Sequence, residues 1–380
     1  MRFLHTSDWH LGRIFHGLHM TDDQAILLEE LIALVKESNV DAVLIAGDIY
    51  DRAVPPTQAV TLLDEVLRRL VQEAGKNVIM IAGNHDNADR LGFGQSLLSQ
   101  NKLYITGPVS PSTQPVVLYD TYGPVYFAPL TYGEPLAASE LLRQPLKTHE
   151  DVVRWQISNQ LRQIPDTARK VALAHVFLTG AQESPESERP LAIGGATTVG
   201  IDCFAPFNYA ALGHLHACQN GSSKVRYSGS LLKYSFNEVQ QSKGVHIVDM
   251  AADGSITVET VQLKPRRELA CLRGSFSELV SKPQPELYDC YLQVTLTDEQ
   301  PILDAKYRLE QVYPNILHLE YARLHSGNDA DTAAVNHKKL GTAELFEAFF
   351  TQVNNRQLTD SEKSLLSDII NSEVQTERQA

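Results

Sequence analysis

The stretch that decides the fold is Val78-Ile79-Met80-Ile81-Ala82-Gly83-Asn84-His85-Asp86, in which an apolar run ends in small residues and is followed at once by polar ones. A short, continuous apolar run is typical of a strand that is buried on both faces of a sheet. The polar residues therefore come at the carboxyl end of a buried strand. In open α/β sheets, binding sites form at these strand ends.

The same pattern recurs elsewhere in the chain, each time with a polar residue after the apolar run. The other runs are Arg2-Phe3-Leu4-His5-Thr6-Ser7-Asp8, Ala42-Val43-Leu44-Ile45-Ala46-Gly47-Asp48, Val171-Ala172-Leu173-Ala174-His175 and Tyr209-Ala210-Ala211-Leu212-Gly213-His214. Helical patterns over about 21–36 and 57–73 separate the first three runs, and Thr21 with Gln24 predicts a capping box for the first helix. This β-α-β-α-β order predicts parallel strands with right-handed crossovers, so the polar strand ends should meet at one edge of a sheet.

Outside these runs the composition changes. Residues 108–133 are rich in proline, glycine, tyrosine and valine, which predicts short antiparallel strands. Segments 224–228, 244–250 and 255–262 have a similar composition. We therefore expect a second sheet or a β-sandwich beside the first.

The last third of the chain is predicted to hold a small α+β unit and a helical tail. The predicted elements are strands near 269–273, 288–296 and 315–321, a helix opened by a Ser275…Glu278 capping box, a helix near 301–312, and two amphipathic helices, the second opened by Thr359…Glu362. The predicted domains are a catalytic domain at 1–262, an α+β capping domain at 263–325, a polar linker at 326–341 and a helix-loop-helix tail at 342–375.

Composition excludes several classes of protein. The chain has 33 Lys and Arg against 46 Asp and Glu, a net charge of −13, which excludes a uniformly basic surface that binds nucleic acid unaided. No apolar run approaches the ~20 residues of a membrane helix, and no apolar signal segment stands at the N-terminus, so we expect a cytoplasmic protein without membrane association. The 4 cysteines have no zinc-ligand spacing and are expected to be buried.

The polar strand ends supply side chains suited to divalent cations. They are Asp8, His10, Asp48, Asn84, His175, His214 and His216. This oxygen and nitrogen set is large enough for two cations if one carboxylate bridges them. In Asp8-x-His10 and His214-x-His216, side chains two apart on an extended segment point the same way. Taken singly, each residue is more often a turn, cap or structural residue, so it is the joint pattern that favours a two-metal site.

In chain order these motifs read D-x-H, G-D, G-N-H-D, H and G-H-x-H, and over the first 216 residues the sequence resembles the calcineurin-like metallophosphoesterases. The resemblance implies an α/β fold in which two sheets form a sandwich with αββα layers. It also implies two divalent metal ions. The implied ligands are Asp8, His10, Asp48 and His216 for the first metal and Asp48, Asn84, His175 and His214 for the second.

Within that superfamily the chain resembles the SbcD-type nucleases. The resemblance rests on His5-Thr6-Ser7-Asp8-Trp9-His10-Leu11-Gly12, Tyr227-Ser228-Gly229-Ser230, Phe236-Asn237-Glu238 and the layout of the last third. It implies a homodimeric, Mn²⁺-dependent subunit that cleaves double-stranded DNA as a 3′–5′ exonuclease and single-stranded or hairpin DNA as an endonuclease. It further implies an SbcC-type ATPase partner, bound by the C-terminal helices, in double-strand-break and hairpin processing.

The resemblance also implies a catalytic role for His85, which would stabilise or protonate the leaving group, and a role for Asp51 in orienting His85. Archaeal and eukaryotic relatives carry histidine in place of Asp51, so their balance of exonuclease and endonuclease activity is not carried over. No ATP-binding G-x-x-x-x-G-K-[ST] motif occurs, so any ATP dependence must come from a partner. Two alternatives remain: a phosphoesterase of this fold that acts on small molecules or proteins, and a non-catalytic scaffold, which the complete ligand set disfavours.

Overall fold

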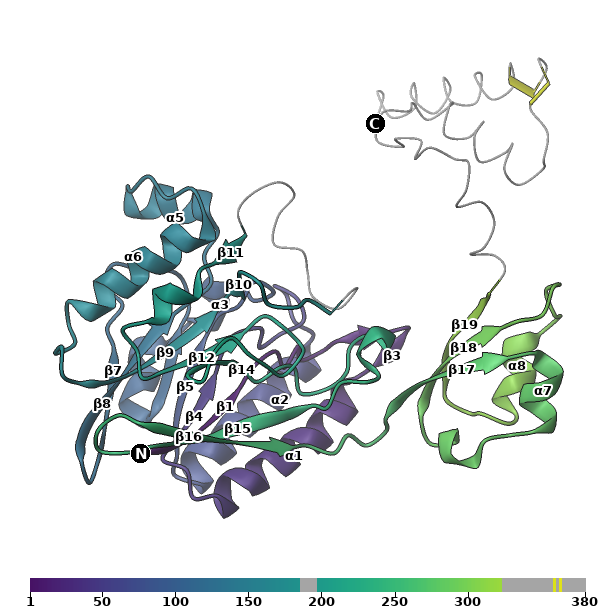
Figure 1. The fold of residues 1–380 in the computed structure, drawn as a ribbon, viewed down its shortest axis with the longest axis horizontal. Helices are drawn as coiled ribbons and strands as arrows, with labels where there is room; N and C mark the ends of the chain where they lie inside the picture. The colour runs from purple at the N-terminus through teal and green to yellow at the C-terminus, as the bar shows by residue number, and fades with distance from the viewer. Residues whose placement is uncertain (185–196, 323–357, 360–361, 364–380) are drawn as a thin grey trace. The chain divides into compact units, whose positions relative to one another are not determined.

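The computed structural model describes residues 1–184, 197–322, 358–359 and 362–363 (Figure 1). Its contacts divide the chain into two units, Met1–Tyr321 and Ala322–Ala380. The first unit holds two six-stranded sheets and a three-stranded sheet. The predicted boundaries within this unit, at 262 and 263, remain predictions.

The first six-stranded sheet contains the strand from the G-N-H-D motif. Its order is β16 (Ile256–Gln262), β15 (Gly244–Met250), β1 (Arg2–Thr6), β4 (Ala42–Ile45), β5 (Asn77–Ile81) and β6 (Leu103–Thr106). Strands β1, β4 and β5 are parallel, as predicted, and β6, which was not predicted, continues them in parallel. Strands β15 and β16 add an antiparallel edge. The parallel strands therefore place their polar carboxyl ends along one edge.

The second six-stranded sheet confirms the expectation of a further sheet. Its order is β13 (Gln219–Asn220), β14 (Val225–Tyr227), β12 (Tyr209–Gly213), β9 (Arg169–His175), β8 (Gly123–Leu130) and β7 (Val116–Asp120). Of the three late segments expected in it, however, only 224–228 is there, because 244–250 and 255–262 form β15 and β16 and pair with the first sheet through β1. The hairpin of β7 and β8 is antiparallel, as the composition of 108–133 predicts, whereas β8, β9, β12 and β14 run parallel.

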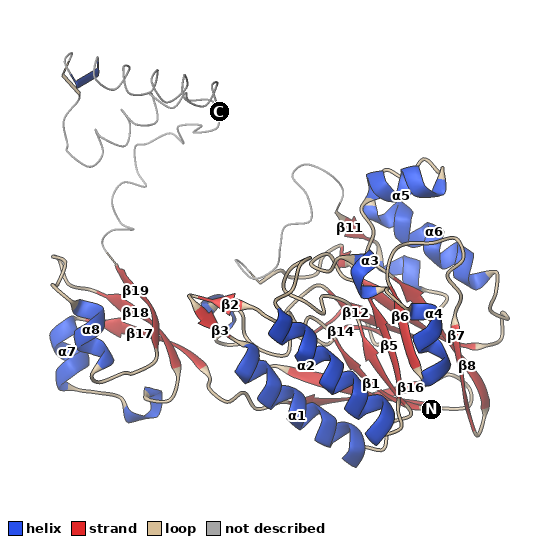
Figure 2. Ribbon diagram, turned by 180° about the vertical axis from the view of Figure 1, so that it is seen from behind, coloured by secondary structure: helices blue, strands red, loops and turns tan. Residues whose placement is uncertain are grey.

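Three apolar cores stack these elements into layers. Helices α1 (Thr21–Glu37) and α2 (Thr57–Arg68) cover the outer face of the first sheet (Figure 2), and helix α6 (His149–Leu161) covers the outer face of the second. Between the sheets, Phe3 and Leu44 pack with Phe127 and other residues of the second sheet. The predicted αββα sandwich is confirmed.

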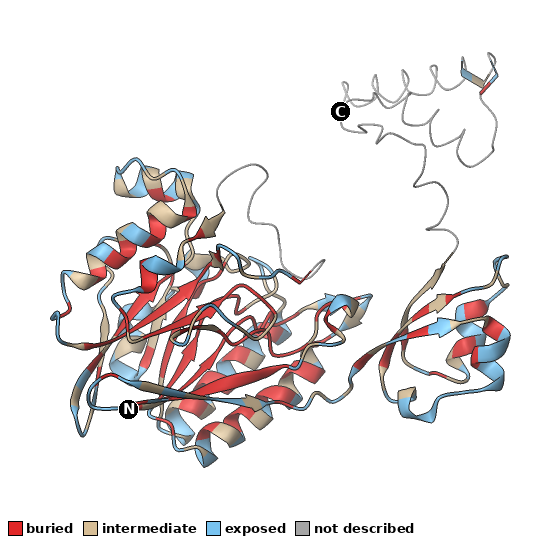
Figure 3. Ribbon diagram, viewed as in Figure 1, coloured by how far each residue is buried: buried red, intermediate tan, exposed pale blue. Residues whose placement is uncertain are grey.

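Burial on both sides explains why the strands are apolar throughout. In β4, Val43 and Ile45 face the helices while Leu44 faces the second sheet, and all three are 0% exposed. Figure 3 shows the central strands coloured as buried. Fully burying one such side chain contributes roughly 1.5–3 kcal/mol. A strand with polar residues at alternate positions would lose that contribution on one face.

The capping box predicted at the start of α1 is wrong. The N-cap is Met20, and no side chain caps the helix. Gln24 instead lies fully buried and donates through Nε2 to the carbonyls of Trp9 (3.1 Å) and His10 (2.8 Å) and to Tyr234 Oη (2.9 Å). Its Oε1 accepts from the amide of Gly12 (3.1 Å). Gln24 therefore holds the loop that follows β1.

We expect Gln24→Leu to lower the free energy of unfolding by about 2–4 kcal/mol, because it leaves the Gly12 amide and the His10 carbonyl buried without this partner. Thr21→Ala should change it by no more than about 0.5 kcal/mol. Urea denaturation of both variants measures the difference. Equal losses in the two variants would instead support a capping box formed by Thr21 and Gln24.

The α+β unit has the predicted elements. Its three strands, β17 (Leu269–Gly274), β18 (Tyr291–Leu296) and β19 (Ile316–Tyr321), are parallel and alternate with helices α7 (Phe276–Ser281) and α8 (Ala305–Glu310). The hydroxyl of Ser275 accepts from the amide of Glu278 at 3.3 Å and caps α7, as predicted. The unit has its own apolar core, which includes Leu292, Leu309 and Tyr313.

The remaining helices and strands are short connections. They are β2 (Ile14–Phe15), β3 (Leu18–His19), α3 (Ala88–Leu91), α4 (Gln95–Leu98), α5 (Pro135–Leu142), β10 (Phe177–Leu178) and β11 (Thr198–Val199). The helix predicted over 57–73 is α2 followed by a π-helical turn at Arg69–Glu73. Among the described residues, no helix combines the length and apolar character needed to cross a bilayer.

The predicted linker at 326–341 and most of the predicted tail at 342–375 lie outside the described residues. The capping box of the second tail helix falls on described residues and is present. Thr359 Oγ1 accepts from the amide of Glu362 (3.4 Å), and Glu362 Oε2 accepts from the amide of Thr359 (2.8 Å). This reciprocal pair satisfies two backbone donors at a helix start.

Candidate metal centre

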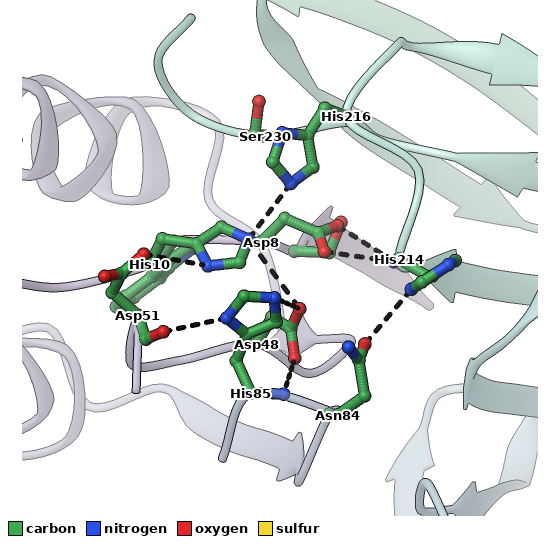
Figure 4. Close-up of polar contacts among 12 residues, drawn as sticks. Asp8, His10, Asp48, Asp51, Asn84, His85, His214, His216 and Ser230 are labelled. Atoms are coloured by element: carbon green, nitrogen blue, oxygen red, sulfur yellow. Dashed lines mark hydrogen bonds and ion pairs between the residues drawn. The ribbon is translucent and has the colours of Figure 1, made fainter. Parts of the chain in front are cut away.

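The predicted ligands meet where β1, β4, β5, β9 and β12 end (Figure 4). The first sheet contributes Asp8, His10, Asp48 and Asn84, and the second contributes His175, His214 and His216. All of them except Asn84 are buried. The site therefore exists only where the two sheets are packed together.

One cluster matches the ligand set predicted for the first metal. His10 Nε2 and His216 Nε2 lie 3.0 Å apart, and a carboxylate oxygen of Asp8 lies within 4.8 Å of the donor atoms of both. Asp48 Oδ2 is 3.7 Å from His10 Nε2. Imidazole nitrogens and carboxylate oxygens that converge in this way are suited to a divalent transition metal.

The other cluster matches the set predicted for the second metal. Asn84 Oδ1 lies 2.8 Å from His175 Nε2 and 3.1 Å from His214 Nδ1. Asp48 Oδ1 lies 3.5 Å from His175 Nε2. The two oxygens of Asp48 thus face different clusters, which is the arrangement a bridging ligand requires.

The backbone is strained at several of these residues. Asp8, His10, Asp48 and His214 have φ angles of 51°, 46°, 49° and 104°. Residues other than glycine rarely adopt this left-handed region, and such strain concentrates at functional sites. Gly83 is required for a different reason, because a Cβ there would overlap the carboxylate of Asp48.

Burial and mutual attraction set the charges in the site. Burial lowers the pKa of His10 and of His214 well below the usual value, so both imidazoles are neutral and able to bind a cation. Burial raises the pKa of Asp8 to about 6. Burial also acts on Asp48 and His175, but their mutual attraction outweighs it, so the pKa of Asp48 lies well below its usual value and that of His175 rises to about 9.

Neighbouring groups orient the ligands. His175 Nδ1 lies 2.9 Å from the carbonyl of Ala46, which can only accept, so His175 donates from Nδ1 and turns Nε2 toward the cluster. Asp8 accepts from Ser7 Oγ (2.5 Å) and from the amide of His214 (3.0 Å). Ser7 Oγ in turn lies 2.9 Å from Ser228 Oγ, which explains part of the Tyr227–Ser230 motif.

His85 lies beside both clusters, but Asp51 contacts it differently from the expectation. The imidazole donates from Nδ1 to the backbone carbonyl of Asp51 (2.7 Å), and Nε2 lies 4.0 Å from Asp48 Oδ2. The Asp51 carboxylate instead binds the guanidinium of Arg13 at 2.8 Å. A main-chain oxygen therefore orients His85, and a carboxylate does not.

Asp86, the last residue of the G-N-H-D motif, has a structural role. Its carboxylate accepts from the amides of Ile49 (3.1 Å), Tyr50 (2.9 Å) and Gly83 (2.9 Å). These bonds join the chain after β4 to the chain after β5. Asp86 thereby keeps Asp48 and Asn84 in neighbouring positions.

Two residues support the ligands in ways that the sequence did not predict. Gln24 has the spacing of a helix cap but holds the loop of His10. Glu238, in the Phe236-Asn237-Glu238 motif, is 0% exposed and lies 3.2 Å from His216 Nδ1. Burial raises the pKa of Glu238, but the hydrogen bond from His216 and the charge of Lys243 outweigh it and lower the pKa to about 2. The available signal was that Glu238 is the only acidic residue within 221–248.

The donor set fits two divalent cations. Two carboxylates, an amide oxygen and neutral imidazoles converge at short distances, and buried His10 Nδ1 has no hydrogen-bond partner among the described residues. A bound cation would take the place of the proton on His175 and separate the closely spaced donors.

We therefore expect Mn²⁺ to stabilise the metal-free protein. At a free concentration of 100 times Kd the gain is about 2.7 kcal/mol for one site. Scanning calorimetry of EDTA-treated protein, with and without added Mn²⁺, measures the rise in Tm. An unchanged Tm at saturating Mn²⁺ would contradict a metal centre at these residues.

Solved structures with a similar fold include TT1561 of Thermus thermophilus (15% identity, TM-score 0.41, 69% of this chain and 98% of that chain). A dimetal phosphatase from Danio rerio has 12% identity and a TM-score of 0.39, and the match covers 69% of this chain and 96% of that chain. GAP50, the anchor in the inner membrane complex of Plasmodium, has 12% identity and a TM-score of 0.37, and the match covers 88% of this chain and 98% of that chain. These scores are too low to bear on function.

Family models give a clearer result. Residues 265–354 match the SbcD_C model, described as a type 5 capsule protein repressor C-terminal domain. Residues 1–218, more than half of the chain, match the calcineurin-like phosphoesterase model. Members of that family hydrolyse phosphoesters with divalent metal ions, and the clusters at Asp8, His10, Asp48 and His175 are candidate sites for them. The chain therefore belongs to the calcineurin-like phosphoesterase family.

Proposed function

We propose that this chain is a DNA nuclease subunit of the SbcD type, which cleaves phosphodiester bonds with two Mn²⁺ ions and acts with an SbcC-type ATPase. The observation that carries the proposal is the joining of a two-cluster metal centre to an SbcD_C segment at 265–354 in one chain. A phosphatase of small molecules has no need of that segment.

The metal ligands would be those of the two clusters, with Asp48 shared between them. Divalent ions held there would supply positive charge for the phosphate and lower the pKa of a water molecule. Because the Asp51 carbonyl fixes the Nδ1–H of His85, a protonated His85 would donate its second proton, from Nε2, to the leaving oxygen. The side chain of His85 is 11% exposed, so it is accessible at the surface of the site.

Charge supports a role for partners. With a net charge of −13, the isolated chain should bind DNA weakly outside the metal centre. A homodimer joined to an ATPase would present several binding surfaces to one DNA, and linked sites gain affinity without new contacts. We expect double-stranded and hairpin DNA to be the substrates of such an assembly.

The test is cleavage by the purified full-length chain with Mn²⁺. Linear duplex DNA labelled at its 3′ or 5′ end, a DNA hairpin and p-nitrophenyl phosphoesters are compared, with and without the ATPase partner. We expect degradation of the duplex and nicking of the hairpin, both removed by EDTA. Rapid hydrolysis of the small esters with both DNAs intact would overturn the DNA assignment and favour the alternative phosphoesterase.

A second experiment tests the partner. A variant lacking residues 340–380 should not co-purify with the SbcC-type ATPase but should retain the Mn²⁺-dependent Tm of the full chain. Size-exclusion chromatography measures complex formation. Co-elution of the shortened chain with the ATPase would contradict a partner-binding tail.

A further inference from the structure

Glu238 faces His216 on the side away from the metal cluster. The 3₁₀ turn Phe236–Glu238, capped by Ser235, places its carboxylate 3.2 Å from His216 Nδ1. His216 Nε2 faces the donor atoms of the first cluster. An imidazole held in this way by a carboxylate keeps its proton on Nδ1 and leaves the Nε2 lone pair for a metal.

Lys243 fixes the other oxygen of the same carboxylate. Its ammonium lies 2.5 Å from Glu238 Oε2 and also donates to the carbonyl of His216 (2.7 Å) and to Gln241 Oε1 (2.8 Å). Lys243 is 7% exposed and Glu238 is 0% exposed. The two carboxylate oxygens thus face different partners. Oε1 faces His216, and Oε2 accepts from Lys243 and from the amide of Tyr234 (3.4 Å).

The other ligand imidazoles are held by different groups. His175 donates to a backbone carbonyl, and His10 Nδ1 has no hydrogen-bond partner within the described part of the chain, its closest carboxylate oxygen being Asp51 Oδ1 at 3.9 Å. Glu238 contacts the first cluster through His216.

We propose that Glu238 is the positioning residue of the first metal site. Because Lys243 occupies one oxygen of the side chain, only a carboxylate, which has a second acceptor, can also accept from His216. The inference rests on the metal ligands of the proposed function but not on its substrate.

Glu238→Gln separates this role from packing. An amide has one acceptor, and an ammonium can only donate, so the amide oxygen must face Lys243. Its NH₂ group then faces His216 Nδ1, which must accept, and the imidazole proton moves to Nε2. That nitrogen then has no lone pair for the metal, although the shape of the side chain is unchanged.

Removing the lysine should reverse the effect. In Glu238→Gln/Lys243→Met no ammonium requires the amide oxygen. The amide can then turn its oxygen toward His216 and restore the Nδ1–H tautomer, at the loss of the long bond from the Tyr234 amide (3.4 Å). Glu259→Gln is the matched control, because Glu259 lies exposed on β16.

Mn²⁺ binding to the full chain is measured by titration calorimetry and electron paramagnetic resonance, and the His216 tautomer by the ¹⁵N shifts of the metal-free protein. We expect Glu238→Gln to lower the affinity of one site about 10–100-fold, with mononuclear Mn²⁺ at the other. The double variant and Glu259→Gln should bind two ions as the wild type does.

Two ions bound at wild-type affinity by Glu238→Gln would overturn the proposal, and so would a double variant as impaired as the single one. If Glu238→Gln does not fold, the metal-free wild type decides, because Glu238 should hold His216 as its Nδ1–H tautomer, and an Nε2–H tautomer in the ¹⁵N shifts would overturn the proposal. Failure of the wild type to cleave DNA would instead count against the proposed function only, since these measurements use no substrate.

Discussion

Asp48→Asn should abolish phosphodiester cleavage, with a loss in kcat of at least about a thousandfold, or about 4 kcal/mol of activation free energy. The reason lies in the two carboxylate oxygens, which face His10 and His175 in different clusters. An asparagine offers an oxygen to only one cluster and an NH₂ group to the other, and it lacks the charge that both share. At least one cation should be lost.

Metal analysis and kinetics together check this expectation. Elemental analysis should find at most one Mn²⁺ per Asp48→Asn chain against two in the wild type. Asp249→Asn is the matched control, because Asp249 is exposed on β15 and its carboxylate lies 3.7 Å from Nε of Arg2, away from the clusters. A variant that keeps both ions and most of its activity would show that Asp48 does not bridge.

His85→Gln should reduce kcat about 10²–10⁴-fold while both metal ions stay bound. His85 donates to a backbone carbonyl and lies 4.0 Å from Asp48, so its loss removes a proton donor without removing a ligand. Rates with a DNA substrate, measured beside the metal content of the same preparation, separate the two effects. Loss of metal would make His85 a ligand or a structural residue.

Asp51→Ala tests whether the backbone carbonyl or the carboxylate of Asp51 acts on His85. The alanine keeps the backbone carbonyl that orients the imidazole and removes only the carboxylate bound to Arg13. We therefore expect a much smaller loss of kcat than in His85→Gln. Equal losses would indicate that the carboxylate itself acts on His85.

The parts of the fold that depend on local pattern could be predicted from the sequence. The run that begins at Ala42 and leads to Asp48 is apolar because both faces of β4 are buried. Burial on both faces can therefore be inferred from the run itself. The candidate ligands follow such runs directly, so the rule that parallel strands end at one edge predicts that Asp8, Asp48 and Asn84 converge. That rule does not predict that the second sheet brings His175 and His214 beside them. The Ser275 cap, in which only the hydroxyl half of the predicted box forms, and the reciprocal box at Thr359 are equally local.

The interactions that could not be predicted join distant parts of the chain. Thr21 and Gln24 have the spacing of a capping box, but Gln24 donates to the hydroxyl oxygen of Tyr234, 210 residues away. No local sequence pattern shows that Gln24 binds this distant partner and not the start of its own helix. Glu238 meets His216 only because a 3₁₀ turn follows β14. The sequence also does not distinguish the side chain of Asp51 from its carbonyl as the partner of His85.

The division of the ligands between two sheets also bears on the synthesis of the protein. His10 and His216 are 206 residues apart in the chain, yet their imidazoles lie 3.0 Å apart. A growing chain presents its first oxygen ligands long before the nitrogen ligands of the second sheet leave the ribosome. The first metal site can therefore close only after most of the phosphoesterase layers have been translated, and a chain that ends before His216 holds no assembled centre for phosphoester hydrolysis.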